Sequence, residues 1–164
     1  MTERQIRLFG DPVLRSACDP IVPGDPRVKG LIEDLLETVR VPGRAGLAAN
    51  QIGVGLRAFS YNVDGEVGYI INPILVETSG ELEAIEEGCL SVPGFYFPRK
   101  RYPFARVTGI DLKGNPIELS GEGVMAQALQ HETDHLDGHL YIEGLDPEAK
   151  RDAMRAIRQA PWWD

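Results

Sequence analysis

Segments with helical periodicity enclose a middle region of short strand-like runs, and this arrangement limits the possible folds more than any other feature of the sequence. Apolar residues recur at helical spacing over Val28–Val39, which predicts a helix with one buried stripe. A second helix is expected over residues 124–137, ending at Gly138, and a third over residues 147–159. Strands in the middle of a chain with helices at both ends are typical of the α+β class.

The middle region contains several strand-like runs separated by Gly, Asn and Pro. The stretch Lys113-Gly114-Asn115-Pro116 predicts a hairpin turn, and connections this short favour antiparallel pairing. The expected strands are residues 56–61, 67–72, 74–78, 106–112 and 117–119, with a further small strand at 140–142. We therefore predict one domain over residues 1–164, with short, mostly antiparallel strands around a central helix and a C-terminal helix.

The composition excludes several classes of protein. The 164 residues carry a formal net charge of −8, which disfavours a nucleic-acid binder. Apolar runs are too short to span a membrane, and residues 1–5 lack the pattern of a secretory signal. The two cysteines, Cys18 and Cys89, are too few for a disulfide scaffold. We therefore expect a cytoplasmic monomer that does not insert into membranes.

The second helix contains an H-E-x-x-H motif, His131-Glu132-Thr133-Asp134-His135. Residues four apart lie one turn apart on the same face of a helix, so the two imidazoles can bind one ion. Glu132 would lie beside that ion, where it can handle the proton of a bound water. The motif predicts a metal-dependent hydrolase, and a chance occurrence on a solvated helix face is the alternative.

A catalytic metal site needs a third protein ligand and one open position. Downstream, Glu143 and Glu148 lie too close to the motif to return to the ion. Gly138 separates His139 from the helix, so we interpret His139 as a surface or turn histidine. Cys89 is the best upstream candidate, although a lone cysteine is more often a small buried residue.

Three segments together resemble the peptide deformylase family and follow its order and approximate spacing. They are Gly46-Leu47-Ala48-Ala49-Asn50-Gln51, Glu87-Gly88-Cys89-Leu90-Ser91 and Gln130-His131-Glu132-Thr133-Asp134-His135-Leu136-Asp137-Gly138. The resemblance covers residues 6–145, including the stretch Gly10-Asp11-Pro12-Val13-Leu14-Arg15. It implies removal of the N-formyl group from the formylmethionine of nascent polypeptides, with release of formate.

The resemblance also implies catalytic roles. Cys89, His131 and His135 would be the metal ligands, with Glu132 as the acid/base. Gln51, through its side-chain amide, and Leu90, through its backbone N–H, would stabilise the oxyanion. Thiolate and imidazole ligands suit Fe²⁺ or Zn²⁺. The resemblance implies one divalent ion, Fe²⁺, with Zn²⁺, Ni²⁺ or Co²⁺ as substitutes.

For the substrate, the resemblance implies an extended peptide that lies along the protein like an added strand. The backbones of Ala45, Gly46 and Gly88 would flank this peptide. The apolar pocket for methionine would be lined by Ile85, Val124, Gln127, Ala128 and His131. Gln127 stands where the family commonly has an aliphatic residue, so it either lines the pocket or faces water.

Two charged positions carry further expectations. Arg44 occupies the position of the family's usual first glycine, so either the loop at the entrance has a different shape or Arg44 points outward over the peptide. Glu87 and Arg99 are expected to form an ion pair that holds the cysteine loop, with two unrelated surface charges as the alternative.

The C-terminal segment allows two interpretations. Its basic residues, Lys150, Arg151, Arg155 and Arg158, either contact ribosomal RNA or belong to a solvated amphipathic helix that packs through Met154 and Ile157. The second interpretation is favoured. Trp162 and Trp163 either dock back on the protein or mediate contacts between molecules.

Two rival functions follow from the same residues. If Cys18 joined Cys89, His131 and His135, the result would be a closed structural zinc site of the Cys₂His₂ type, without an open position. An inactive relative that binds formylated peptides is the other rival. Glu132 and Gln51 argue against it, because a protein that only binds needs no general base.

Overall fold

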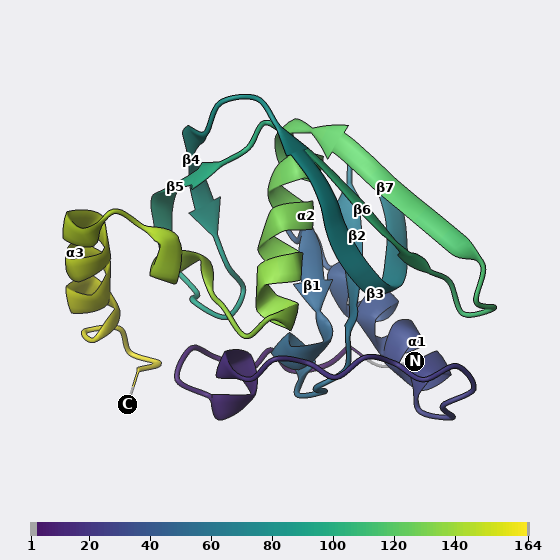
Figure 1. Ribbon diagram of the computed structural model, residues 1–164. Coiled ribbons are helices and arrows are strands. Elements are labelled where there is room, and N and C mark those ends of the chain that lie inside the picture. The colour runs from purple at the N-terminus through teal and green to yellow at the C-terminus, as the bar shows by residue number, and fades with distance from the viewer. Residues whose placement is uncertain (1–2, 164) are drawn as a thin grey trace.

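The computed structural model describes residues 3–163 and contains a five-stranded antiparallel sheet that curves around a central helix (Figure 1). The strand order is β1-β2-β3-β6-β7, and every neighbouring pair is antiparallel. The strands are β1 (Gly46–Ala48), β2 (Ala58–Val63), β3 (Glu66–Ser79), β6 (Phe104–Ile110) and β7 (Pro116–Glu122). The predicted α+β class is confirmed.

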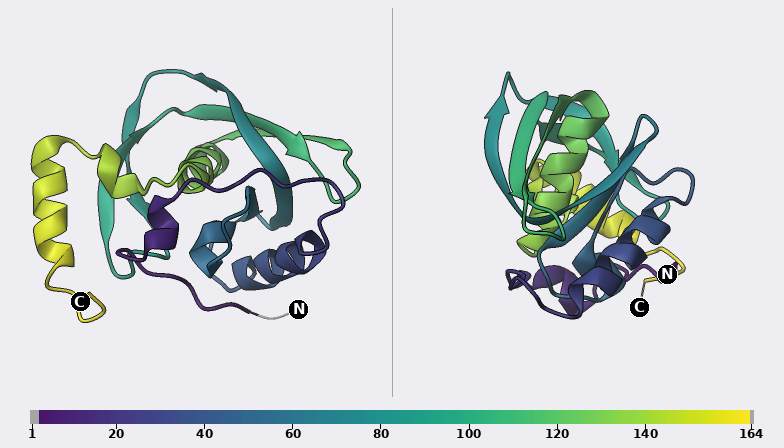
Figure 2. Two further views of the ribbon diagram at one scale, coloured as in Figure 1. Left: turned by 60° about the horizontal axis from the view of Figure 1, so that its bottom comes forward. Right: turned by 90° about the vertical axis from the view of Figure 1, so that its right-hand side faces the viewer.

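Two helices, α1 (Val28–Val39) and α2 (Gly123–Leu136), pack on opposite faces of this sheet (Figure 2). Successive residues of a strand point to opposite faces, so neighbours in the sequence contribute to different cores. Leu47, Ala58 and Ile71 pack with α1, whereas Ala48, Phe59 and Ile70 pack with α2. The sheet thus holds α2 against β1, and this is the arrangement on which the site depends.

A second sheet consists of β4 (Glu83–Gly88) and β5 (Tyr96–Arg101), which lie between α2 and the helix α3 (Pro147–Ile157) (Figure 1). Helix α3 packs on the rest of the protein through the buried Ile157 and Ala153 and the partly buried Met154. Short 3₁₀ helices are found at Pro12–Arg15, Ala49–Ile52 and Tyr141–Gly144. Within residues 3–163, no helix has both the length and the apolar character needed to cross a bilayer.

The strands expected at residues 67–72 and 74–78 form the single long strand β3, so this division was wrong. The register against β6 shifts between Ile71 and Ile74, where Asn72 adopts a positive φ of 51°. Pro73 has no N–H to give to a ladder. Asn72 and Pro73 therefore mark a β-bulge within one strand, not a turn between two strands.

The strand expected at residues 140–142 is also wrong, because Tyr141–Gly144 forms a 3₁₀ helix. The Glu143 carboxylate accepts a hydrogen bond from the Leu140 N–H at 2.8 Å, and the Glu143 N–H donates to the Leu140 carbonyl at 3.1 Å. This reciprocal pair of bonds closes the chain into a turn. The predicted hairpin turn between β6 and β7 is confirmed, with the Asp111 carboxylate accepting from the N–H groups of Lys113 and Asn115.

Candidate metal centre and active site

Helix α2 places His131 and His135 one turn apart on its buried side. Their Nε2 atoms lie 3.0 Å apart, and the rings meet edge to face at 68°. His135 is fully buried, and His131 is 8% exposed. After Leu136 the helix stops, because Gly138 adopts a left-handed φ of +86° that other residues rarely tolerate.

Cys89 follows directly after β4 and brings its thiol to the two imidazoles. Its Sγ lies 3.3 Å from Nε2 of His135. The ligand atoms of Cys89, His131 and His135 all lie within 4.8 Å of one another. Within the described part of the chain, this is the only group of three or more His, Cys, Asp or Glu side chains arranged to hold an ion.

The chemistry of these three donors fits a divalent cation. Two imidazoles and a thiolate form a ligand set that leaves a fourth, open position for water. Burial lowers the pKa of His135 well below its usual value, so its imidazole is neutral, as a ligand must be. Burial acts in the same direction on His131, but Glu132, Cys89 and Glu87 raise the pKa of His131 well above its usual value. Negative charge therefore surrounds the position that a cation would occupy.

A buried network of charges holds His131 from behind. Nδ1 of His131 lies 2.6 Å from Oε2 of Glu87. The Arg101 guanidinium donates to both oxygens of Glu87, at 2.9 and 2.7 Å, and to Asp134 at 2.7 Å. Glu87 is 3% exposed and Arg101 is 4% exposed. A carboxylate partner such as Glu87 fixes the orientation of a ligand histidine. The contribution of Arg101 and Asp134 to this network was not predicted from the sequence.

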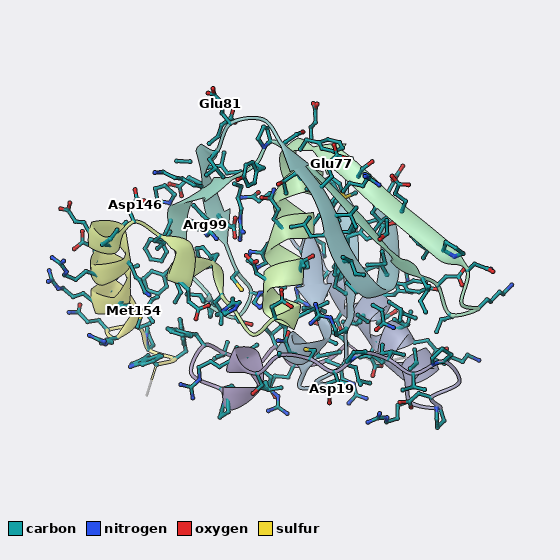
Figure 3. The ribbon with its side chains drawn as sticks, in the orientation of Figure 1. Asp19, Glu77, Glu81, Arg99, Asp146 and Met154 are labelled. Carbon is teal, nitrogen blue, oxygen red and sulfur yellow. The ribbon has the colours of Figure 1, made fainter. Side chains whose placement is uncertain are left out.

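The expected ion pair between Glu87 and Arg99 is wrong, because Arg101 takes that position. Arg99 lies between the β4–β5 sheet and α2 (Figure 3), where it packs against Gly144 and lies 4.0 Å from Asp134. Residues two apart in a strand point to the same face, so both arginines of β5 point toward α2. Only the packing of the two side chains decides which one reaches Glu87.

The Glu132 side chain packs against Gly46 of β1. A Cβ atom at Gly46 would lie 2.6 Å from Oε2 of Glu132, so only glycine leaves room for this carboxylate. Burial raises the pKa of Glu132 to about 7, against the opposing effect of His131. Among residues 3–163, no side chain or backbone group bonds to its buried Oε1. An unpartnered buried carboxylate oxygen is a further sign that a water or an ion belongs here.

The amide of Gln51 has a fixed orientation. Its Oε1 accepts from the Ala48 N–H at 3.0 Å, which turns Nε2 toward the hydroxyl of Ser91 at 3.1 Å and toward Cys89 Sγ at 3.7 Å. The NH₂ group of Gln51 therefore lies beside the candidate metal ligands. Ser91 is fully buried, and its contact with Gln51 was not predicted.

The N-terminal segment joins the two loops that carry these residues. The Arg7 N–H donates to the Gln51 carbonyl at 2.7 Å, and the Phe9 N–H donates to the Ser91 carbonyl at 2.8 Å. Both contacts use only the main chain, so no side-chain pattern in the sequence could have indicated them.

A cavity of about 450 Å³ opens beside these groups. Of the residues expected around the substrate, its wall contains Ala45, Gly46, Gly88, Val124, Gln127, Ala128 and His131, together with Gln51, Cys89, Leu90 and Glu132. Ile85 is not in this wall, because it lies further along β4, paired with Arg99. The loop of residues 92–96 also lines the cavity, and no motif in the sequence indicated this.

Gln127 both lines the cavity and is anchored by hydrogen bonds. Its Nε2 donates to the Glu86 carbonyl at 3.0 Å and lies 3.4 Å from Oε1 of Glu87. The side chain is half-buried. Of the two interpretations, the structure therefore favours a polar group in the cavity wall over one that simply faces water.

Arg44 does not reach over the cavity. Its guanidinium donates to the Thr38 carbonyl at 2.8 Å, in the last turn of α1, and lies 3.8 Å from Glu3. A cation is favourable at the C-terminal end of a helix. Gly43, one residue earlier, has a φ of +89° and lines the cavity in its place.

Two residues considered as ligands lie elsewhere. Cys18 is buried in the core between the sheet and α2, and its N–H donates to the Leu136 carbonyl at 2.8 Å. Within residues 3–163, Cys18 is not part of the group that could hold an ion. His139 is exposed and lies 3.2 Å from Glu143, as expected for a surface histidine.

Known proteins resemble this chain over almost its full length. The profile of the polypeptide deformylase family matches residues 3–151. A peptide deformylase of Acidothermus cellulolyticus is 51% identical over 162 residues, which cover 99% of this chain and 89% of that protein. The crystal structure of a peptide deformylase from Legionella pneumophila has a TM-score of 0.88 at 38% identity, covering 96% of this chain and 95% of that one. A peptide deformylase from Ehrlichia chaffeensis, solved in complex with actinonin, has a TM-score of 0.87 at 30% identity, covering 99% of both chains. This chain belongs to the polypeptide deformylase family.

Proposed function

We propose that this protein hydrolyses the N-formyl amide of the formylmethionine that begins nascent polypeptides, releasing formate and a free amino terminus. The observation that carries the proposal is the convergence of Cys89, His131 and His135 beside the buried carboxylate of Glu132. The relatives named peptide deformylase match the whole stretch that contains these residues.

The proposed mechanism depends on proton transfer by Glu132. A divalent ion held by Cys89, His131 and His135 would lower the pKa of a bound water to about 7 and so supply a nucleophile at neutral pH. Glu132 accepts the proton of the water as attack on the formyl carbon begins. It then returns this proton to the departing amine, because an amide nitrogen does not leave as an anion. A buried carboxyl whose pKa is raised to about 7 suits both tasks.

Gln51 and Leu90 stabilise the negative oxygen that develops on the formyl group. The hydrogen bond from the Ala48 N–H holds the side-chain amide oxygen of Gln51, so the NH₂ group of the same amide remains directed toward the reacting centre. Leu90 lines the cavity next to Cys89, and its backbone N–H is the second donor. Losing one such donor typically lowers the rate by ~10²–10³.

The peptide binds as an added strand between two sheet edges. β1 is the terminal strand of the five-stranded sheet, and β4 belongs to the separate two-stranded sheet. Ala45, Gly46 and Gly88 from these two edges line the same cavity and offer main-chain groups to an extended peptide. Val124, Gln127 and Ala128 of α2 provide the wall for the methionine side chain, whereas Ile85 lies outside this wall.

We propose Fe²⁺ as the native ion. Thiolate and imidazole donors accept Fe²⁺, Zn²⁺, Ni²⁺ and Co²⁺, so the ligand set alone does not decide. Anaerobic reconstitution of the metal-free protein with each ion tests the proposal of Fe²⁺, and equal or faster turnover with Zn²⁺ refutes it.

We also propose a cytoplasmic location, because a thiolate ligand and unpaired cysteines persist in a reducing compartment.

The central experiment measures formate release from formyl-Met-Ala-Ser by the wild type, by Glu132→Ala and by Glu122→Ala. Glu132→Ala should keep its metal and lose its rate, because the three ligands remain but the proton acceptor is gone. Glu122 is exposed at the start of α2 and serves as the matched control. Acetyl-Met-Ala-Ser should not be hydrolysed. A wild type that releases no formate, or a Glu132→Ala variant with full activity, refutes the proposed function.

The exposed basic residues of α3 support a second, subordinate proposal of contact with ribosomal RNA. Lys150, Arg151, Arg155 and Arg158 are all exposed, while Ala153 and Ile157 on the same helix are buried. Replacing these four residues with Glu should abolish co-sedimentation with ribosomes, because the variant would repel the phosphates of the RNA. Unchanged co-sedimentation leaves only the solvated amphipathic helix.

A further inference from the structure

The chain after α3 folds back on the loop of residues 92–96, which we call the wall loop because it lines the cavity. The indole Nε1 of Trp162 donates to the Pro93 carbonyl at 3.0 Å. The rings of Trp162 and Phe95 lie 6.4 Å apart and meet edge to face at 74°. Trp162 thus holds the wall loop on the side away from the substrate, by one hydrogen bond and one ring contact.

At its two ends the wall loop is held independently of Trp162: Val92 is fully buried and its N–H donates to the Cys89 carbonyl at 2.9 Å, and Tyr96 pairs with Gly88 of β4. Gly94 adopts a φ of +88°, and apart from its chain neighbours no residue among 3–163 has an atom within 4 Å of the position that its Cβ would take. Tyr96, the first residue of β5, ends the loop, and its side chain is 70% exposed. Between these two ends, residues 93–95 have few tertiary contacts, and segments of this kind belong to the less stable parts of a protein.

The contact continues inward through a series of aromatic rings. The ring centroids of Phe95 and Phe97 lie 5.9 Å apart, and those of Phe97 and Tyr141 lie 6.1 Å apart. The ring centroids of Tyr141 and His131 lie 6.0 Å apart. The wall loop is therefore fixed between the C-terminal tail on one side and the rings beside the candidate metal centre on the other.

Trp163 makes a different contact. Its ring lies 5.4 Å from that of Phe9, in the N-terminal segment, and packs on Gly10. It touches neither Pro93 nor Phe95 in the hydrogen bonds and ring contacts of the described chain. The two neighbouring tryptophans therefore offer a matched pair, of which only Trp162 contacts the wall loop.

We propose that Trp162 is a positioning residue that sets the affinity for the formylated peptide by holding the wall loop in its binding form. Trp162 acts through Pro93 and Phe95 and does not touch the reacting atoms. The inference rests on the proposed deformylase activity. It predicts that loss of Trp162 weakens substrate binding while the chemical step and the metal content are preserved.

Steady-state kinetics with formyl-Met-Ala-Ser test this prediction on Trp162→Phe, Trp162→Ala and Trp163→Phe. Loss of one neutral hydrogen bond corresponds to a change of roughly two- to tenfold. Trp162→Phe, which keeps a ring but loses the N–H, should raise KM about threefold, and Trp162→Ala should raise it about tenfold. The turnover number kcat should stay within about twofold, and Trp163→Phe should behave as the wild type.

Hydrogen–deuterium exchange supplies a readout that does not need activity. In Trp162→Ala the amides of residues 92–96 should exchange faster, while those of α2 keep their protection, because only the loop loses its contact. If Trp162→Ala does not fold, Trp162→Phe decides the question alone. An unchanged KM or an unchanged exchange in the wall loop overturns the inference, as does a loss confined to kcat. A wild type without formate release refutes the proposed function instead, and the exchange experiment then still tests the loop contact.

Discussion

Oε2 of Glu87 lies 2.6 Å from Nδ1 of His131, and this contact determines which nitrogen of the ring faces the metal site. Burial acts to raise the pKa of Glu87, but hydrogen bonds from Arg101 and His131 outweigh it and lower the pKa to about 2. Glu87 is therefore ionised at neutral pH and holds the proton of His131 on Nδ1. Nε2 is left free to bind a cation.

Replacing Glu87 with Gln should lower metal affinity by about 10–100-fold, because the amide oxygen is a weaker hydrogen-bond acceptor for the His131 N–H and carries no charge. Competition with a chelator of known affinity measures the effect. Glu86→Gln is the control, since Glu86 is the exposed neighbour that contributes only its carbonyl to Gln127. Equal metal affinity in both variants would show that Glu87 does not support the ligand.

Arg101→Met should destabilise the protein by about 3–5 kcal/mol, because it leaves the buried carboxylate of Glu87 without its partner. Arg106→Met is the matched control. Arg106 pairs with Glu77 and Glu118 across exposed strand faces, and such pairs contribute about 0–1 kcal/mol. Urea denaturation of both variants measures the two free energies of unfolding. Similar losses in the two variants would contradict a special role for the buried pair.

The activity should fall as the pH decreases on the acidic side, because Glu132 must be ionised to accept a proton. Burial raises the pKa of this carboxyl to about 7. A bound cation favours the ionised carboxylate, so it shifts the acidic limb of the pH–activity profile to lower pH. Well below the pKa, kcat/KM should fall about tenfold per pH unit. A profile of kcat/KM over about pH 5 to 8 measures the limb. A profile that stays flat to its acidic end would exclude Glu132 as the titrating base.

The two cysteines should differ in their reaction with iodoacetamide. Burial raises the pKa of Cys18 to about 11, against the opposing effect of Arg57, so its thiol stays protonated and inert. Cys89 is partly exposed and should react once a chelator removes the ion. Peptide mapping should find label at Cys89 in the metal-free native protein and at Cys18 only after unfolding. Loss of metal in Cys18→Ser would instead support the structural Cys₂His₂ site.

Gln127→Leu should shift selectivity toward larger apolar first residues, because it removes the polar group that Gln127 presents in the cavity wall. The measurement is the ratio of kcat/KM values for formyl-Met, formyl-Leu and formyl-norleucine peptides. A pocket change of one methylene is worth about 1–3 kcal/mol, or about 10–200-fold. An unchanged ranking of the three peptides would place Gln127 outside the methionine pocket.

Local geometry explains why the metal motif could be predicted from the sequence. His131 and His135 converge because any α-helix brings residues four apart to the same face. Cys89, in contrast, has no local relation to the helix, and it was indicated only as the best upstream candidate for a third ligand and by the resemblance to a family. The pairing of Glu87 with Arg101 could not be predicted, since Arg99 offers the same charge on the same face.

The strands that were missed lack the alternation on which strand prediction depends. In β4 the buried position is Glu87, whose partner is the charged Arg101, so the half-buried Ile85 is the only large apolar residue on the inward face. β1 has only three residues and begins with Gly46, which the approach of Glu132 requires. In both cases the residues that break the pattern are those that build the site.

The main-chain bonds of Arg7 and Phe9 make the leading segment a working part of the catalytic centre, although it lies far from every motif in the sequence. A truncation or fusion that displaces residues 7–9 would remove the main-chain bonds to Gln51 and Ser91 at the same time. Preparations that differ only at this end of the polypeptide can therefore differ in turnover, and comparisons between them need identical leading residues.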